Sequence, residues 1–152
     1  MKLLIIGDSH GNIANLKHVM GFAKSMDAKA VIHTGDWNTL KSLETVFNYN
    51  IPIYTVLGNA DIDPKLARRV KDQWLKIKLG DVNIGIVHKL TISHQPLIIG
   101  CDIVFTGHYH SQKEWEIDGV KIVRCGALEN KIEFAVFDTK TKIIEFVNHD
   151  KV

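Results

Sequence analysis

Short, mainly apolar runs alternate with segments of helical periodicity along the first half of the chain. The apolar runs are "KLLII" at residues 2–6, "AKAVIHT" at 28–34 and "IPIYTVL" at 51–57. Continuous apolar runs of this length are typical of strands that are buried on both faces. Helices are expected at residues 13–26, 39–47 and 64–70, the first of them capped by Asn12. This alternation predicts parallel strands joined by helices.

The second half of the chain has a different pattern, in which paired apolar runs flank short turns. Hairpins are expected at residues 73–90, 113–126 and 132–147, and one more buried strand begins at Cys101 and ends at a glycine. Antiparallel strands are therefore expected to join the parallel ones in a layered α/β domain. In an open α/β sheet, ligands bind beyond the carboxyl ends of the strands.

Composition and charge narrow the class of protein. The 152 residues are 45% hydrophobic and 24% charged, which is typical of one globular domain, here residues 1–152. We find neither a secretory signal nor an apolar run long enough to span a bilayer, so a cytoplasmic protein is expected. Cys101 and Cys125 are expected to be reduced thiols. A net charge of +2 is too weak to indicate nucleic acid as a partner, except as a substrate.

Polar, potentially metal-binding side chains follow the predicted buried strands, and most of these groups are preceded by glycine. They are Asp8 and His10, then Asp36, then Asn59 and Asp61, then His88, and then His108 and His110. One histidine after a strand is usually a cap or a satisfied polar group, but five successive groups favour a metal site. Imidazole, carboxylate and amide ligands without a thiolate suit Mn²⁺, Fe²⁺, Ni²⁺, Zn²⁺ or Co²⁺. Even without Asp61, the seven remaining ligands are too many for one tetrahedral zinc ion, and they suit two ions roughly 3.5–4 Å apart.

The order of these motifs resembles that of the calcineurin-like metallophosphoesterases. The motifs are "GDSHGN", "GDW", "GNAD", "IVHKL" and "TGHYH", and together they extend over most of the chain. The short length is similar to that of the compact bacterial and archaeal phosphodiesterases of this family, whose fold the retromer scaffold subunit shares. The resemblance implies a four-layered αββα sandwich, in which two mixed β-sheets lie between helices.

The resemblance also implies a role for each motif residue. One ion would be held by Asp8, His10, Asp36 and His110, and a second by Asp36, Asn59, His88 and His108. Asn12 and Asn59 would face the substrate phosphate. The ions would activate a bridging hydroxide against a small phosphodiester; Mn²⁺ is favoured, and Ni²⁺, Fe²⁺, Zn²⁺, Co²⁺ and Mg²⁺ are the alternatives.

Three positions depart from the family pattern. Ala60 replaces a histidine that would protonate the leaving group, so no side-chain general acid is identified. His94 could take that role only if its loop folds over the site. Lys89 replaces a glycine and could contact a phosphate or be solvated. The segment "RCGALEN" replaces an N-P-G-S turn, which is expected to alter the loop without touching a ligand.

Two hypotheses follow for the whole protein. The first is a metal-dependent phosphodiesterase, and the alternative is a scaffold or regulatory binding protein with little or no turnover. Retention of every predicted ligand favours the enzyme hypothesis, whereas Ala60 leaves the scaffold hypothesis open. Trp37 and Tyr109 could each stack on a nucleobase or an aryl group, or simply pack against the sheet. The edge strands of the second half could pair in a homodimer.

Overall fold

The computed structural model describes residues 1–150, which form two five-stranded sheets and their flanking helices. The first sheet contains β1 (Lys2–Ile6), β2 (Ala30–His33), β3 (Ile53–Thr55), β9 (Glu133–Asp138) and β10 (Ile144–Asn148). The second contains β4 (Trp74–Leu79), β5 (Val82–Val87), β6 (Ile103–Thr106), β7 (Gln112–Ile117) and β8 (Val120–Cys125). The helices are α1 (Ile13–Ser25), α2 (Leu40–Phe47), α3 (Pro64–Arg69), α4 (Gln95–Ile98) and the 3₁₀ helix η1 (Ile92–His94).

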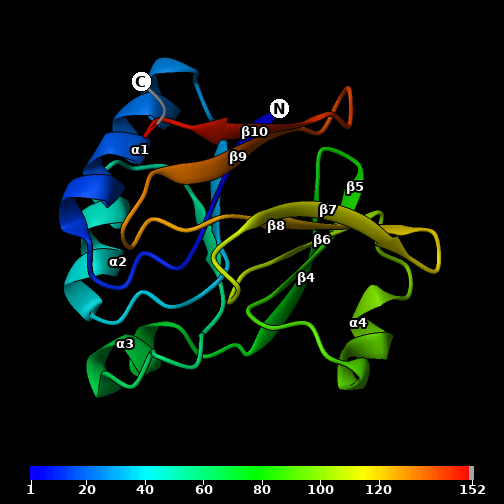
Figure 1. The fold of residues 1–152 in the computed structure, drawn as a ribbon, viewed down its shortest axis with the longest axis horizontal. Helices are drawn as coiled ribbons and strands as arrows, with labels where there is room; N and C mark the ends of the chain where they lie inside the picture. Colours follow the sequence, from blue (N-terminus) through cyan, green and yellow to red (C-terminus); the bar gives the residue numbers. More distant parts are fainter. Residues whose placement is uncertain (151–152) are drawn as a thin grey trace.

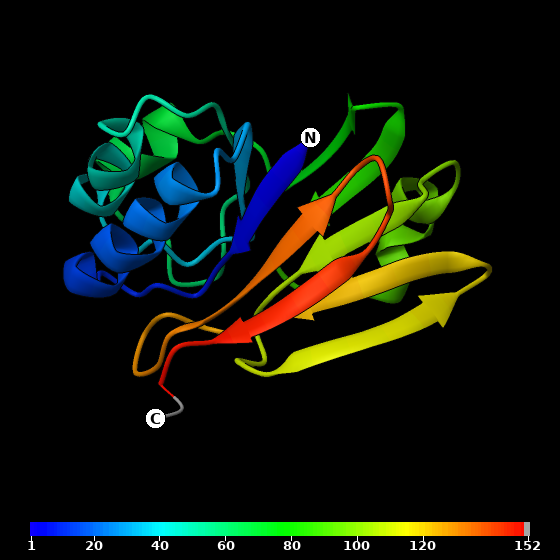
Figure 2. The same ribbon diagram turned by 90° about the horizontal axis from the view of Figure 1, so that it is seen from above.

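The elements form four layers, which confirms the predicted αββα sandwich. Figure 1 shows α1, α2 and α3 on one side of the molecule and α4 on the other, with the strands between them. Figure 2 shows the two sheets from above, with the β9–β10 hairpin reaching over the second sheet. Both sheets are mixed: β1, β2 and β3 are parallel, as are β5, β6 and β8, while β10, β9, β4 and β7 pair in antiparallel fashion.

The continuous apolar run of β1 is explained by its position between two layers. Leu3 and Ile5 pack between the sheets, whereas Leu4 and Ile6 pack beneath α1. Successive side chains of a strand point to opposite faces, so a strand covered on both faces needs apolar residues throughout. The sheets are thereby fixed against each other, and their strand ends are held in fixed relative positions.

The predicted helices and strands of the first half are confirmed, with shorter strands than expected. One segment was not predicted: η1 and α4 lie between β5 and β6. Each of these helices is only about one turn long, and α4 includes Pro96. The stretch is too short for helical periodicity to be detected in the sequence. Leu97 and Ile98 of α4 are buried against the second sheet and close its outer face.

The structure bears on two expectations drawn from composition. Within residues 1–150, no helix has the length and apolar character needed to cross a membrane. Cys101 and Cys125 are both free and buried. Burial also raises the pKa of the Cys125 thiol, which keeps it in the neutral form.

Candidate metal centre

All seven predicted ligands come from loops that follow the carboxyl ends of parallel strands. Asp8 and His10 follow β1, Asp36 follows β2, Asn59 follows β3, His88 follows β5, and His108 and His110 follow β6. Because the two sheets face each other, these strand ends meet at one edge of the sandwich. The structure therefore brings together side chains that are up to 102 positions apart in the sequence, from Asp8 to His110.

The backbone at this edge is unusual. Asp8, His10, Asp36, His108 and His110 all have positive φ angles, between 43° and 76°. Non-glycine residues enter this left-handed region at a cost of roughly 1–2 kcal/mol each, and such residues cluster at functional sites. Five of the seven predicted ligands carry this strain, which indicates a site held in place by the surrounding structure.

Two glycines allow the ligand loops to approach one another closely. A Cβ atom on Gly35 would lie 2.9 Å from the Nδ1 atom of His88, and Gly35 itself has a φ of +106°. A Cβ atom on Gly107 would lie 2.7 Å from the Oδ2 atom of Asp8. Real Cβ atoms do not tolerate such contacts, so these positions require glycine.

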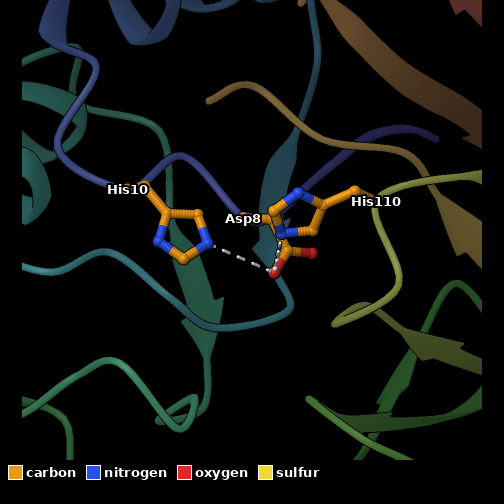
Figure 3. A group of neighbouring side chains, drawn as sticks. All are labelled: Asp8, His10 and His110. Atoms are coloured by element: carbon orange, nitrogen blue, oxygen red, sulfur yellow. Dashed lines mark ion pairs between the residues drawn. The ribbon is translucent and has the colours of Figure 1, made fainter. Parts of the chain in front are cut away.

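A first group of potential ligands is formed by Asp8, His10 and His110 (Figure 3). The Oδ1 atom of Asp8 lies 3.4 Å from Nε2 of His110 and 3.9 Å from Nε2 of His10. Figure 3 shows the two rings on either side of the Asp8 carboxyl group, reaching it from separate loops. Asp36 adjoins the group, since its Oδ2 atom lies 3.3 Å from Nε2 of His10.

Two atoms of this group are buried without a hydrogen-bond partner among residues 1–150: Oδ1 of Asp8 and Nε2 of His10. A buried polar atom with no partner is costly, and in native proteins it calls for an explanation such as an ion. Both atoms are of the types that bind divalent cations, and both point into the same space. The donor set thus fits a metal ion.

A second group lies beside the first. The Nε2 atom of His88 is 3.2 Å from Oδ2 of Asp36 and 2.8 Å from Oδ1 of Asn59. The Nδ1 atom of His108 lies 3.1 Å from the same Asn59 oxygen. The other ring nitrogen of His88 is 3.0 Å from the carbonyl oxygen of Thr34, to which it donates when protonated. That hydrogen bond leaves Nε2 free to act as a ligand.

The pKa values of Asp8 and Asp36 are shifted in opposite directions, although both side chains are buried. Burial, together with the neighbouring Asp36 carboxylate, raises the pKa of Asp8 to about 6 against the opposing effects of His88 and His110. Burial alone would also raise the pKa of Asp36. Hydrogen bonds from His88 and from the backbone N–H of Ala60 outweigh that effect and lower the pKa to about 2. Asp36 is therefore ionised throughout the physiological range.

Asp61 organises the loops that carry Asp36 and Asn59. Its Oδ2 atom accepts hydrogen bonds from the backbone N–H groups of Asp36, at 2.9 Å, and Gly58, at 2.8 Å. Its Oδ1 atom accepts one from the N–H of Asn38 at 2.7 Å. Asp61 thus positions two predicted ligands without facing the space between them.

Asn12 caps α1 as predicted, because its Oδ1 atom accepts the N–H of Asn15 at 3.0 Å. Its Nδ2 atom donates to the backbone carbonyl of Glu129 at 2.7 Å. Both ends of the side chain are engaged, so Asn12 would have to give up one bond to reach a phosphate. Its phosphate-binding role stays a prediction.

Lys89 and His94 line a cavity of about 370 Å³ together with His88, His108 and Asn59. The loop that carries His94 therefore folds to the edge of the site, the condition set above for its acting as an acid. The Nδ1 atom of His94 accepts the N–H of Thr91 at 3.0 Å, which leaves Nε2 as the protonated nitrogen. Its role as a proton donor stays a prediction.

Sequence reasoning missed Glu129, which lies in the "RCGALEN" segment after β8. Its Oε2 atom is 3.6 Å from Nδ1 of His110 and 4.0 Å from Nε2 of His10. The expectation that this segment touches no ligand is therefore wrong. Its position gives no local signal, because Glu129 lies three residues after Gly126, whereas an acid directly follows Gly7 and Gly35.

The two aromatic residues inside the motifs have different environments. Trp37 is fully buried, stacked at 3.6 Å on the ring of His33, and its Nε1–H donates to Thr55 at 2.9 Å. Trp37 and His33 are core residues. Tyr109 is 57% exposed and borders the site beside His108.

Comparison with known proteins agrees with this geometry. Residues 1–142 match the model of the calcineurin-like phosphoesterase superfamily domain. A phosphodiesterase of Methanocaldococcus jannaschii is 26% identical over 158 aligned positions, which cover 93% of this chain and 95% of that protein. The structure of an archaeal phosphodiesterase superposes with a TM-score of 0.83 at 24% identity, covering 97% of this chain and 99% of that one. Vps29 of Entamoeba histolytica, solved with Zn²⁺, superposes with a TM-score of 0.66 at 17% identity, over 97% and 99% of the two chains.

Proposed function

The chain belongs to the calcineurin-like phosphoesterase superfamily, and from that premise we propose that it hydrolyses phosphodiesters at a pair of divalent metal ions. One observation carries the proposal: Oδ2 of Asp36 lies within 3.3 Å of both His10 and His88, which belong to the two neighbouring ligand groups. A carboxylate in that position can bridge two ions. The phosphodiesterase of M. jannaschii, related over nearly the whole length, supports the same activity.

The two groups would divide the ligands between two ions. Asp8, His10, Asp36 and His110 would hold the first, and Asp36, Asn59, His88 and His108 the second. Asp8 is also within reach of the second group, because its Oδ1 atom lies 4.0 Å from Nε2 of His88. Such a pair, when bound, lowers the pKa of a coordinated water and neutralises charge on the phosphoryl oxygens.

The chain's own residues would then orient the substrate. The amide of Asn59 lies between His88 and His108, where its nitrogen can donate to a phosphoryl oxygen while its oxygen faces the ion. Lys89, at the wall of the cavity, adds a positive charge for an anionic substrate. We favour diesters over monoesters because, among residues 1–150, Lys89 is the one lysine or arginine that lines that cavity, and a monoester carries an extra charge.

A second candidate function, a scaffold with little turnover, is supported by the likeness of the fold to Vps29 and by Ala60 in place of the family histidine. It predicts metal binding without catalysis. The retained ligand set weighs against it.

The test is hydrolysis of bis-p-nitrophenyl phosphate and p-nitrophenyl phosphate by metal-stripped protein. Mn²⁺, Ni²⁺, Zn²⁺ and Mg²⁺ are added back separately, with Asp36→Asn as the inactive control. Metal-dependent turnover of the diester in excess of the monoester would support the proposal. Stoichiometric metal binding with no turnover of either ester would favour the scaffold.

A further inference from the structure

The loop between β8 and β9 is fastened to the loop that carries the first ligands. The N–H of Leu128 donates to the carbonyl of Asp8 at 3.2 Å, and Nδ2 of Asn15 donates to the carbonyl of Leu128 at 2.8 Å. The bond from Asn12 to the carbonyl of Glu129 adds a third attachment. Glu129 is thus held at a fixed place beside the first ligand group, although the family motifs do not include it.

The two ring nitrogens of His110 face different carboxylates. Nε2 lies 3.4 Å from Oδ1 of Asp8, inside the first ligand group, and Nδ1 lies 3.6 Å from Oε2 of Glu129. The lone pairs of the two nitrogens diverge, so His110 can bind an ion through Nε2 while Nδ1–H meets an acceptor. Oε2 of Glu129 also lies 4.0 Å from Nε2 of His10, at the margin of the first ligand group. A small rotation of the partly exposed Glu129 side chain would bring its oxygen within hydrogen-bonding distance of Nδ1.

We propose that Glu129 is a positioning residue for the first metal ion, accepting the Nδ1–H of His110 and so directing Nε2 toward the ion. The inference rests on the proposed function only for the assignment of His110 as a ligand. Metal-binding histidines almost always donate their other ring N–H to a carboxylate or carbonyl, which fixes the tautomer and orients the ring. His88 has such a partner in the carbonyl of Thr34, and Glu129 supplies the equivalent for His110.

Lys131, two residues beyond Glu129 in the chain, is engaged elsewhere and does not compete with His110 for the Glu129 carboxylate. Nζ of Lys131 pairs with Oε1 of Glu133 at 2.8 Å and donates to the carbonyl of His110. Lys131 therefore holds the backbone of His110 while Glu129 faces its ring. Both interactions act on His110 from the loop between β8 and β9.

The experiment is calorimetric titration of metal-free protein with Mn²⁺, which requires no turnover. Glu129→Ala should weaken binding of one of the two ions about 10- to 100-fold, the usual effect of losing such a partner. Glu129→Gln, whose amide oxygen can still accept Nδ1–H, should recover most of that loss. Glu116→Ala, which removes an exposed carboxylate on β7, is the matched control and should bind both ions as the wild type does.

A double-mutant comparison separates positioning through His110 from a general effect of charge. In a His110→Ala background, Glu129→Ala should cause no further loss of affinity. The proposal is overturned if Glu129→Ala binds both ions normally, if Glu129→Gln is as weak as Glu129→Ala, or if the loss persists without His110. Failure of diester hydrolysis in the wild type would instead refute the proposed function and leave this result standing.

Discussion

The Oδ2 atom of Asp36 lies 3.2 Å from Nε2 of His88. The same oxygen lies 3.3 Å from Nε2 of His10, on the other side of the site. One carboxylate oxygen thus adjoins both ligand groups, while the other accepts the N–H of Ala60 at 2.8 Å. This geometry places the Asp36 carboxylate between the two proposed ion positions.

Replacing Asp36 by asparagine should therefore weaken the binding of both ions, because the bridging negative charge is lost. His110→Ala, in contrast, should weaken the binding of one ion and leave the other ion bound. Metal content after equilibration with Mn²⁺ and gel filtration gives the two stoichiometries. Retention of two tightly bound ions by Asp36→Asn would contradict the bridging role.

Metal affinity should fall as the pH is lowered through the pKa of Asp8. In the metal-free protein that pKa is raised to about 6, so below this pH a proton must leave Asp8 before the ion binds. His88, whose pKa is also raised, adds a second competing proton. Asp36 binds no competing proton near pH 6, since its pKa is lowered to about 2.

We expect the apparent Mn²⁺ affinity to decline by about tenfold or more per pH unit below pH 6, and to level off above the two pKa values. Calorimetry in two buffers of different ionisation enthalpy measures both the affinity and the protons released. A dissociation constant that does not change between about pH 5 and pH 8 would show that neither group binds the metal.

The absence of an imidazole at position 60 should make the enzyme sensitive to its leaving group. Aryl diesters should be cleaved far faster than alkyl diesters, because an alkoxide needs a proton as it departs. Ala60→His should accelerate the alkyl esters selectively, by up to about 10²-fold, since the N–H of residue 60 already lies against Asp36.

The comparison is the ratio of kcat/KM for bis-p-nitrophenyl phosphate and a dialkyl ester in each variant. If His94 supplies the proton instead, the wild type will cleave alkyl esters well, and His94→Ala will slow those esters alone. Equal ratios in the wild type and in Ala60→His would contradict the role assigned to this position.

Trp37 should matter for stability more than for substrate binding. Removing its buried ring, its stacking on His33 and its hydrogen bond to Thr55 should cost about 3–5 kcal/mol in Trp37→Ala. Trp74 is 46% exposed on β4, so Trp74→Ala provides the control and should cost far less. Chemical denaturation of the metal-free proteins measures both changes, and equal losses would show that the burial of Trp37 contributes little.

The residue pattern was sufficient to predict a layered α/β domain with polar loops at the strand ends, because strand periodicity and the position after each strand are local properties. The four-layered sandwich followed from the family resemblance. The run at residues 2–6, for example, is apolar on both faces since it lies between two layers. The short helices at residues 92–98 were missed because their packing depends on the second sheet, not on a repeating pattern.

Glu129 and Asp61 show where local patterns fail. Glu129 belongs to the site because a long-range contact with Asn12 fixes its loop, and no spacing rule encodes that contact. Asp61 stood among the strand-end residues, but its bonds to the backbone of Asp36, Asn38 and Gly58 depend on how two loops meet. Both roles arise from tertiary structure.

The most direct test of a two-ion phosphodiesterase is a titration of metal-free protein with Mn²⁺, in which bound metal and diester hydrolysis are followed in the same samples. We predict that turnover of bis-p-nitrophenyl phosphate rises only as the second equivalent binds, and that Asp36→Asn abolishes both signals. Full activity with a single equivalent bound, or no activity with two equivalents bound, would contradict the account.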